Sequence, residues 1–165
     1  MAGNRLAGLP GRLAPGLLIA GVLIGADQVT KVWAEAALAL HRPVELLPIL
    51  NLTLSYNTGA AFSLFADQGG WQRWAFAALA LGVSGYLIYW LACLGSGKRW
   101  HVAGLGGVLG GAIGNLIDRL AQGHVVDFID FHYSGWHYPA FNVADSAITV
   151  GVVMLIIATF READG

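Results

Sequence analysis

Residues 141–160 read FNVADSAITVGVVMLIIATF, a run of twenty residues in which Asp145 is the only ionisable side chain. At a rise of about 1.5 Å per residue, a helix of this length spans the roughly 30 Å hydrocarbon core of a bilayer. Three further apolar runs occupy residues 17–40, 74–94 and 102–121. The sequence therefore predicts four transmembrane helices, joined by loops at residues 41–73 and 122–140 and by a short third connection.

The composition also indicates a membrane protein. Of 165 residues, 56% are hydrophobic and only 12% are charged, and the mean hydropathy is +0.62. We expect residues 1–165 to form a single integral-membrane domain. The net charge of -1 provides no basic field of the kind that attracts nucleic acid, which excludes that class of partner.

The basic residues predict the orientation of the helices. Arg5 and Arg12 precede the first apolar run, Lys98 and Arg99 separate the second from the third, and Arg161 follows the fourth. Short loops rich in lysine and arginine stay on the cytoplasmic side of a membrane. We therefore expect both termini in the cytoplasm and the two long loops on the outer side.

The first outer loop has a sequence pattern of its own. Leu50, Leu52, Leu54 and Tyr56 alternate with polar residues, which predicts an amphipathic β-strand lying against the membrane. Residues 60–67 follow a turn and predict a short interfacial helix. The expected fold class is an all-α membrane protein with a small β-strand region and a short interfacial helix on the periplasmic side.

Carboxylates within and beside the predicted helices are the main functional signal, because an ionisable side chain in lipid costs at least about 2.5 kcal/mol. Helical rise places Asp145 about 6 Å below the outer boundary, and places Asp118 about 24 Å across the core on an outward-running helix. Asp127 and Asp130 lie in the adjoining loop. Two nearby carboxylic acids can share a proton and hydrolyse a peptide as base and acid. Spacing alone leaves open whether Asp118, Asp127 or Asp130 is the partner of Asp145.

Other charges in the helices also fit structural roles. Asp27 and Lys31 lie four residues apart on one helix face, where they can neutralise each other. Asp118 and Arg119 fit charged links between helices as well as substrate binding. Structural and catalytic interpretations of these residues both remain open at this point.

Five motifs resemble those of the lipoprotein signal peptidases, also called signal peptidase II or prolipoprotein signal peptidase. In chain order they are DQVTK at 27–31, NTGAAFS at 57–63, GNLIDR at 114–119, GHVVDF at 123–128 and FNVADS at 141–146. Their order, the length of the chain and its four apolar runs all match that family.

The resemblance implies an aspartic endopeptidase of the bacterial inner membrane, acting near the periplasmic leaflet. Such an enzyme removes signal peptides from prolipoproteins by cutting before a diacylglyceryl-modified cysteine. The implied partners are these lipidated precursors and membrane lipid, and the implied enzyme is a monomer without metal or other cofactor. The resemblance places the catalytic pair on Asp127 and Asp145. It places substrate contacts on Asn57, Gly59, Asn115, Arg119 and Asn142, and structural support on Asp27, Lys31 and Asp118.

Three other functions fit parts of the sequence less well. Residues 82–85, GVSG, have the shape of a rhomboid-type serine motif, but we expect no histidine in a later helix to act as its base. His124, His132 and His137 would suit a metallopeptidase, but they lack the His-Glu-x-x-His spacing. A transporter with a proton relay would place charges on both membrane sides, whereas these charges gather near one side.

Overall fold

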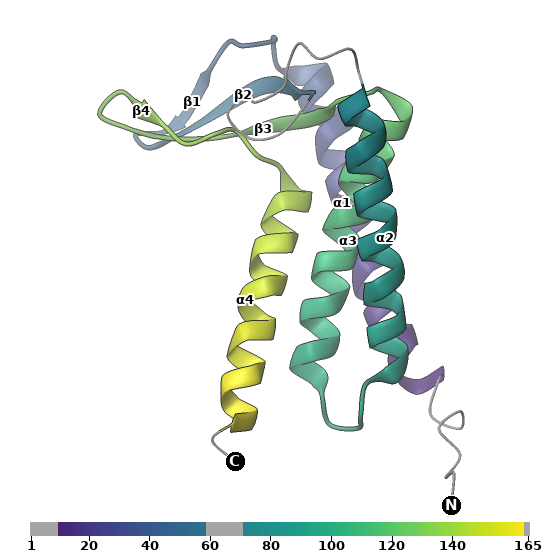
Figure 1. The fold of residues 1–165 in the computed structure, drawn as a ribbon. Helices are drawn as coiled ribbons and strands as arrows, with labels where there is room; N and C mark the ends of the chain where they lie inside the picture. The colour runs from purple at the N-terminus through teal and green to yellow at the C-terminus, as the bar shows by residue number, and fades with distance from the viewer. Residues whose placement is uncertain (1–9, 59–70, 164–165) are drawn as a thin grey trace, which may run out of the picture.

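The computed structural model describes residues 10–58 and 71–163 of the chain. Its helices are α1 (Pro10–Ala37), α2 (Trp71–Cys93), α3 (Arg99–Ala121) and α4 (Val143–Ala163). Each of the four contains a stretch long and apolar enough to cross a membrane, which confirms the four predicted spans. α3 packs against the three other helices, while α2 and α4 stand on opposite sides of it (Figure 1). The first helix begins at Pro10 and ends at Ala37, earlier at both ends than residues 17–40.

Glycines along α3 allow the close helix packing. A Cβ atom at Gly106 would lie 2.7 Å from the carbonyl oxygen of Gly16 in α1, and one at Gly104 would lie 2.8 Å from that of Gly151 in α4. These distances are shorter than carbon–oxygen contacts allow, so only glycine permits the helices to approach this closely.

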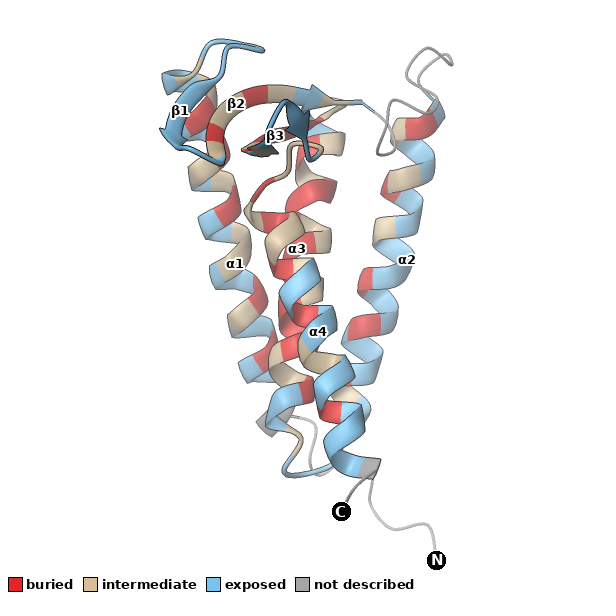
Figure 2. Cartoon of the chain, turned by 90° about the vertical axis from the view of Figure 1, so that its left-hand side faces the viewer, coloured by how far each residue is buried: buried red, intermediate tan, exposed pale blue. Residues whose placement is uncertain are grey.

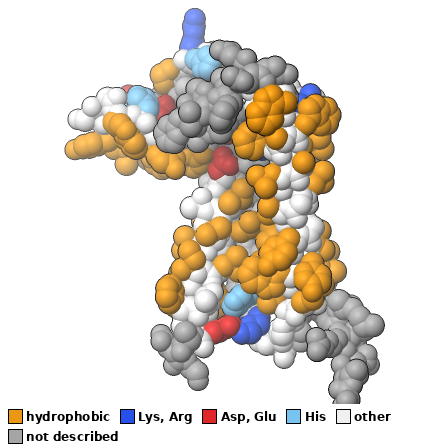
Figure 3. Space-filling model, viewed as in Figure 1, with side chains coloured by type: hydrophobic (Ala, Val, Ile, Leu, Met, Phe, Trp, Pro, Cys, Tyr) orange, Lys and Arg blue, Asp and Glu red, His pale blue; other side chains and the backbone are white. Residues whose placement is uncertain are grey.

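Burial is arranged as expected for a bundle surrounded by lipid. Buried residues follow the length of α3, whereas the outward faces of α1, α2 and α4 are exposed (Figure 2). The exposed residues are largely apolar, and they include Leu18, Val32, Leu79, Val150 and Phe160. Figure 3, which has the same view as Figure 1, shows many hydrophobic side chains on the surface of the bundle and along the lower edge of the sheet.

An antiparallel sheet lies at one end of the bundle and extends sideways beyond α4 (Figure 1). Its strands follow the order β1 (Val44–Leu47), β2 (Leu50–Asn57), β3 (Val125–Tyr133) and β4 (Trp136–His137). β2 confirms a strand at the predicted place, although its buried residues are Asn51 and Leu54 rather than one alternating apolar face. Residues 125–133 were expected to be loop, but they pair with β2 along most of its length. The interfacial helix predicted at residues 60–67 lies outside the described residues.

Candidate active site

Asp127 and Asp145 come together at the junction between the sheet and the bundle. Asp127 lies on β3 and Asp145 lies in the first turn of α4. Asn142 precedes α4 and caps it, because its side-chain oxygen accepts a hydrogen bond from the backbone N–H of Asp145 at 2.9 Å. The side-chain nitrogen of the fully buried Asn142 donates to a carboxylate oxygen of Asp127 at 2.8 Å. One amide thus connects the two acidic residues.

Asn115 makes a second connection, and its orientation is fixed by its neighbours. Its side-chain oxygen accepts from the Nζ of Lys31 at 3.0 Å and from the side-chain nitrogen of Asn142 at 3.1 Å. Since a lysine ammonium can only donate, the Asn115 oxygen must face it. The Asn115 nitrogen is then directed to Asp145, to which it donates at 2.7 Å.

Lys31 occupies the centre of a buried charge cluster. Its Nζ lies 2.7 Å from an oxygen of Asp27 and 2.7 Å from an oxygen of Asp118, and all three side chains are at most 3% exposed. Asp27 also accepts from the backbone N–H of Ala144, and Asp118 accepts from that of Val126. The cluster therefore joins α1 and α3 to the beginnings of α4 and β3.

Asp127 has an environment that favours its protonated form. The residue is 3% exposed, and burial together with the Asp145 carboxylate raises the pKa of Asp127 to about 7. Hydrogen bonds from Asn57 at 3.2 Å and from Asn142 oppose this rise without cancelling it. At neutral pH this carboxyl group therefore holds its proton for a substantial part of the time.

Arg119 brings a positive charge to the same place. Its guanidinium lies 5.2 Å from the centre of the Phe76 ring of α2 and donates to the backbone oxygen of Asn115 at 3.3 Å. Its charge is attracted by both Asp145 and Asp127. The arginine is thus positioned beside the carboxyl pair, between α2 and α3.

A groove of about 340 Å³ opens beside Asp145, below the sheet. Its other lining residues come from the sheet end of α4 and the segment before it, and they are Tyr138, Phe141, Ser146, Thr149 and Val150. Asp145 therefore borders a largely apolar space.

Asp130 and Asp118 have other partners. Asp130 accepts from Thr53 at 2.9 Å and lies 2.9 Å from the His137 ring. Although burial opposes it, the hydrogen bonds from His137 and Thr53 hold the pKa of Asp130 below its ordinary value. Asp118 is bound to Lys31. Of the three alternatives left open by spacing, the geometry favours Asp127 as the partner of Asp145.

The competing sites receive no support from the described part of the chain. No group of three or more His, Cys, Asp or Glu residues there is placed to hold a metal ion. Ser84 has a buried hydroxyl without a hydrogen-bond partner among the described residues. The expectation that no later helix contains a histidine was wrong, because α3 begins at Arg99 and includes His101. His101 lies 3.4 Å from Glu162, however, and has no hydrogen bond to Ser84.

The sequence interpretation missed one residue of this site and could not place another. Gln28 donates to Asp27, to Asp118 and to the backbone oxygen of Gly114, so it ties α1 to α3 beside the charge cluster. Its position inside the DQVTK motif was the available signal. Gly59 lies outside the described residues.

Comparison with known proteins agrees with this geometry. Residues 19–161 match the family described as signal peptidase (SPase) II. The chain belongs to the signal peptidase II family. A lipoprotein signal peptidase of Hydrogenovibrio crunogenus is 54% identical over 144 residues, which cover 86% of this chain and 83% of that protein. A lipoprotein signal peptidase of Pseudomonas aeruginosa PAO1 is 51% identical over 154 residues, which cover 92% of this chain and 90% of that protein.

Two solved structures of bacterial membrane enzymes share the fold of this signal peptidase II. A bacterial membrane enzyme structure at 2.3 Å resolution matches with a TM-score of 0.77 and 31% identity, over 90% of this chain and 88% of that one. A second bacterial membrane enzyme structure, at 1.9 Å resolution, matches with a TM-score of 0.74 and 32% identity, over 87% of this chain and 91% of that one. The predicted family, fold class and enzyme class, an aspartic peptidase, are confirmed.

Proposed function

We propose that Asp127 and Asp145 are the catalytic pair with which this aspartic peptidase removes signal peptides from prolipoproteins. The observation that carries this proposal is the Asn142 side chain, which is bonded to both residues and fixes them relative to each other. The raised pKa of Asp127 supplies the unequal protonation that general acid–base catalysis by two carboxyl groups requires.

The environments of the two acids suggest their roles. Asp127 holds the proton, while Asp145 is the ionised base, stabilised by the N–H of Asn115 and by the nearby charges of Lys31 and Arg119. Asp145 takes a proton from the attacking water as Asp127 gives its own to the scissile carbonyl oxygen. The resulting gem-diol then collapses, the C–N bond breaks, the leaving nitrogen takes the proton from Asp145, and a diol proton returns to Asp127.

The remaining polar residues divide into positioning and substrate-contacting groups. Asn115 and Asn142 use their amides on the catalytic carboxyl groups, so they hold the acids in place. Among the described residues Arg119 donates a single hydrogen bond, to the backbone oxygen of Asn115. Its other N–H groups can bind a backbone carbonyl of the signal peptide. Asn57 donates to the carboxylate oxygen of Asp127 that Asn142 does not contact, at the place where β2 pairs with β3.

The substrate is a lipidated precursor, cut before its diacylglyceryl-modified cysteine. The apolar groove beside Asp145 supports this, because each buried acyl methylene contributes about 0.8 kcal/mol to binding. We propose that the enzyme acts as a monomer, because the hydrogen bonds that join Asp127, Asn142 and Asp145 all form within one chain. The distribution of basic residues supports an orientation with both termini in the cytoplasm and with the sheet and the site at the periplasmic surface.

The test is cleavage of a diacylated prolipoprotein by the purified protein in detergent. We expect one cut before the modified cysteine, at the same rate with and without a metal chelator or a serine-reactive fluorophosphonate. Loss of activity with the chelator would instead indicate a metallopeptidase, and loss with the fluorophosphonate would indicate a serine peptidase.

A further inference from the structure

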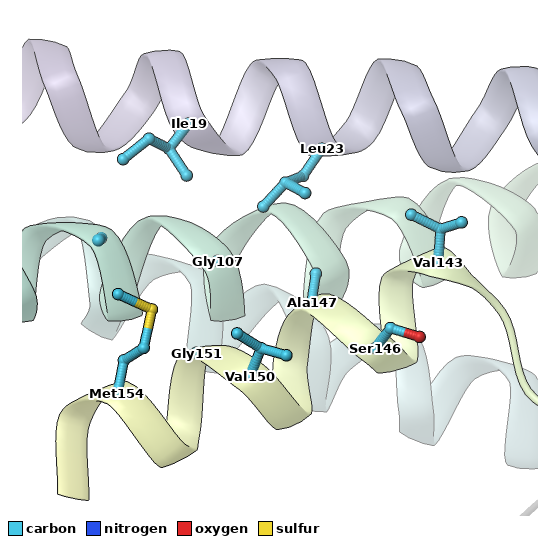
Figure 4. Close-up of a pocket in the computed structure, with 10 residues that line it drawn as sticks. Ile19, Leu23, Gly107, Val143, Ser146, Ala147, Val150, Gly151 and Met154 are labelled. Atoms are coloured by element: carbon cyan, nitrogen blue, oxygen red, sulfur yellow. The ribbon is translucent and has the colours of Figure 1, made fainter. Parts of the chain in front are cut away.

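A second groove lies on a different side of α4 from Asp145. It is formed by α1, α3 and α4 and has a volume of about 350 Å³. Figure 4 shows Ile19 and Leu23 extending from α1 toward α4, and Ala147 and Val150 extending from α4 toward α1. Its α4 residues 143, 147, 150 and 154 share one helix face, whereas Asp145 is rotated by about 200° from Val143. The groove meets the one beside Asp145 at Ser146 and Val150, which line both, but neither Asp127 nor Asp145 lines it.

The groove offers nothing to a polar occupant. Ser146 is the one polar side chain in its lining, and its hydroxyl donates to the backbone oxygen of Asn142 at 2.9 Å. Water requires two to four polar partners, so it has no stable place here. The volume is more than twice the roughly 150 Å³ in which an apolar cavity binds benzene. An extended apolar group such as an acyl chain fits both properties.

The groove continues to the end of the bundle that is remote from the sheet. A cavity of about 230 Å³ shares Ala103 and Met154 with it and reaches Arg99. Arg99, Ala103 and Gly107 lie four residues apart, so they form a floor along one face of α3. From Arg99 to Gly107 this floor runs about 12 Å, which is less than half of the roughly 30 Å hydrocarbon core. One acyl chain of the leaflet at this end of the bundle therefore reaches along the whole floor.

The end of the groove carries an uncompensated positive charge. Lys98 pairs with Glu162, which neutralises that acid. Arg99 is exposed, and its guanidinium makes no hydrogen bond or ion pair with any part of the chain that the structure describes. Its backbone N–H donates to the oxygen of Gly97 at 3.0 Å. A third cavity, of about 440 Å³, is lined by both Lys98 and Arg99 and joins the groove at Ile19. Basic pockets between transmembrane helices are sites for the headgroups of anionic lipids.

We propose that this α1/α3/α4 groove binds an anionic phospholipid. One acyl chain lies over Ala103 and Gly107, and the phosphate meets the guanidinium of Arg99. The phosphate and this chain lie away from Ser146 and Val150, where the groove meets the one beside Asp145, so the proposal does not depend on the proposed roles of Asp127 and Asp145.

The experiment measures lipid retention by the full-length protein in detergent, using native mass spectrometry. The probes are phosphatidylglycerol and phosphatidylethanolamine with identical acyl chains. We expect phosphatidylglycerol to bind about fivefold more tightly, the effect of one basic side chain near an anionic headgroup. Arg99→Gln should reduce the affinity for phosphatidylglycerol to that for phosphatidylethanolamine. Arg161→Gln is the matched control, because Arg161 packs over Trp100 at the same end but does not line the groove, and it should keep the preference.

A second variant tests the acyl chain rather than the headgroup. Ala103→Leu places bulk on the floor of the groove, so it should weaken the binding of both lipids. Equal affinity of the unaltered protein for the two lipids, or a preference that survives Arg99→Gln, would overturn the proposal. Unchanged binding by Ala103→Leu would also overturn it. Thermal unfolding without added lipid shows whether each variant is folded. If Ala103→Leu does not fold, the result for Arg99→Gln alone decides the test.

Discussion

The clearest consequences at the scale of single residues concern the proton that Asp127 and Asp145 would exchange. Asparagine preserves the size of aspartate but cannot transfer this proton, so Asp127→Asn and Asp145→Asn should each lower kcat by about 10²–10⁴-fold. Because the two acids act as a unit, the double variant should be scarcely slower than either single one. Cleavage of a lipidated precursor measures these rates.

Asp130 is the matched control for this pair. It lies on the same strand, is 6% exposed and is bonded to Thr53 and His137 rather than to the catalytic groups. Asp130→Asn should therefore retain nearly full kcat once corrected for the amount of folded protein. An inactive Asp130→Asn beside an active Asp127→Asn would refute the assignment.

The pH dependence follows from the raised pKa of Asp127. A general acid works in its protonated form, so kcat/KM should fall as the pH rises through about 7, where Asp127 loses its proton.

The free energy of unfolding should also decrease as the pH rises. The folded protein holds this proton up to about pH 7, whereas the unfolded chain releases it near 3.8, so stability is lost between these values as pH rises. Between pH 5 and pH 8 the unfolding temperature should therefore fall less in Asp127→Asn than in the unaltered protein. A rate that increases from pH 7 to 8 would contradict Asp127 as the acid.

At this scale the sequence could indicate Asp145 but could not choose its partner. Asp145 follows Asn142 on a recognisable helix start, so its depth and direction could be derived. The choice among three other aspartates depends on β3, whose register is set by pairing with β2, where Asp127 lies opposite Ser55 and Asp130 lies opposite Asn51. Contacts so distant along the chain leave no local periodic signal, and only the family resemblance selected Asp127.

Among the secondary-structure elements, the four helices were predictable and the second long strand was not. Apolar runs of bilayer length determine the helices regardless of their neighbours. The first four residues of β3 are all buried, so the alternation that identifies an amphipathic strand is missing there. Such a strand is recognised only when its partner is known.

The packing of α3 against α4 gives a prediction at the scale of elements. Gly111 lies against the backbone of Ala144, one residue before Asp145. Gly111→Leu should force the two helices apart, lower the unfolding temperature and lower kcat by moving Asp145. Gly82→Leu is the control, because nothing lies within 4 Å of a Cβ atom at that α2 position. Equal effects of both substitutions on unfolding and cleavage would show that this close approach is unimportant.

The charge cluster that joins α1 to α3 gives a second prediction at this scale. Lys31→Met leaves Asp27 and Asp118 buried without their counter-ion, which should cost about 3–5 kcal/mol of folding free energy. Lys98→Met breaks the pair between Lys98 and Glu162, whose side chains are 36% and 43% exposed, and should cost much less because solvent screens an exposed ion pair. Unfolding in detergent compares the two. A cost for Lys31→Met as small as that for Lys98→Met would indicate that the cluster contributes little to stability.

For the whole molecule, the arrangement of bundle and sheet connects the site to its substrate. The acids lie where the sheet meets the bundle, and a largely apolar groove lies beside Asp145. A signal peptide is itself an apolar helix, so it can reach the acids laterally from the membrane. The diacylglyceryl group can then enter the groove next to the scissile bond.

This arrangement predicts that cleavage depends on the lipid. If the acyl chains occupy the groove, a precursor with an unmodified cysteine loses several methylene contacts of about 0.8 kcal/mol each, and it should accumulate uncut. The measurement compares kcat/KM for precursors that differ only in the diacylglyceryl group. Thr149→Trp, which narrows this groove one helical turn beyond Asp145 and does not line the second groove, should raise KM for the lipidated precursor more than it lowers kcat. Leu79→Trp serves as the control, since Leu79 lies on the exposed face of α2 and should leave both constants unchanged. Equal kcat/KM for the lipidated and unlipidated precursors would mean that the groove does not select the acyl chains, even if Asp127 and Asp145 carry out the hydrolysis.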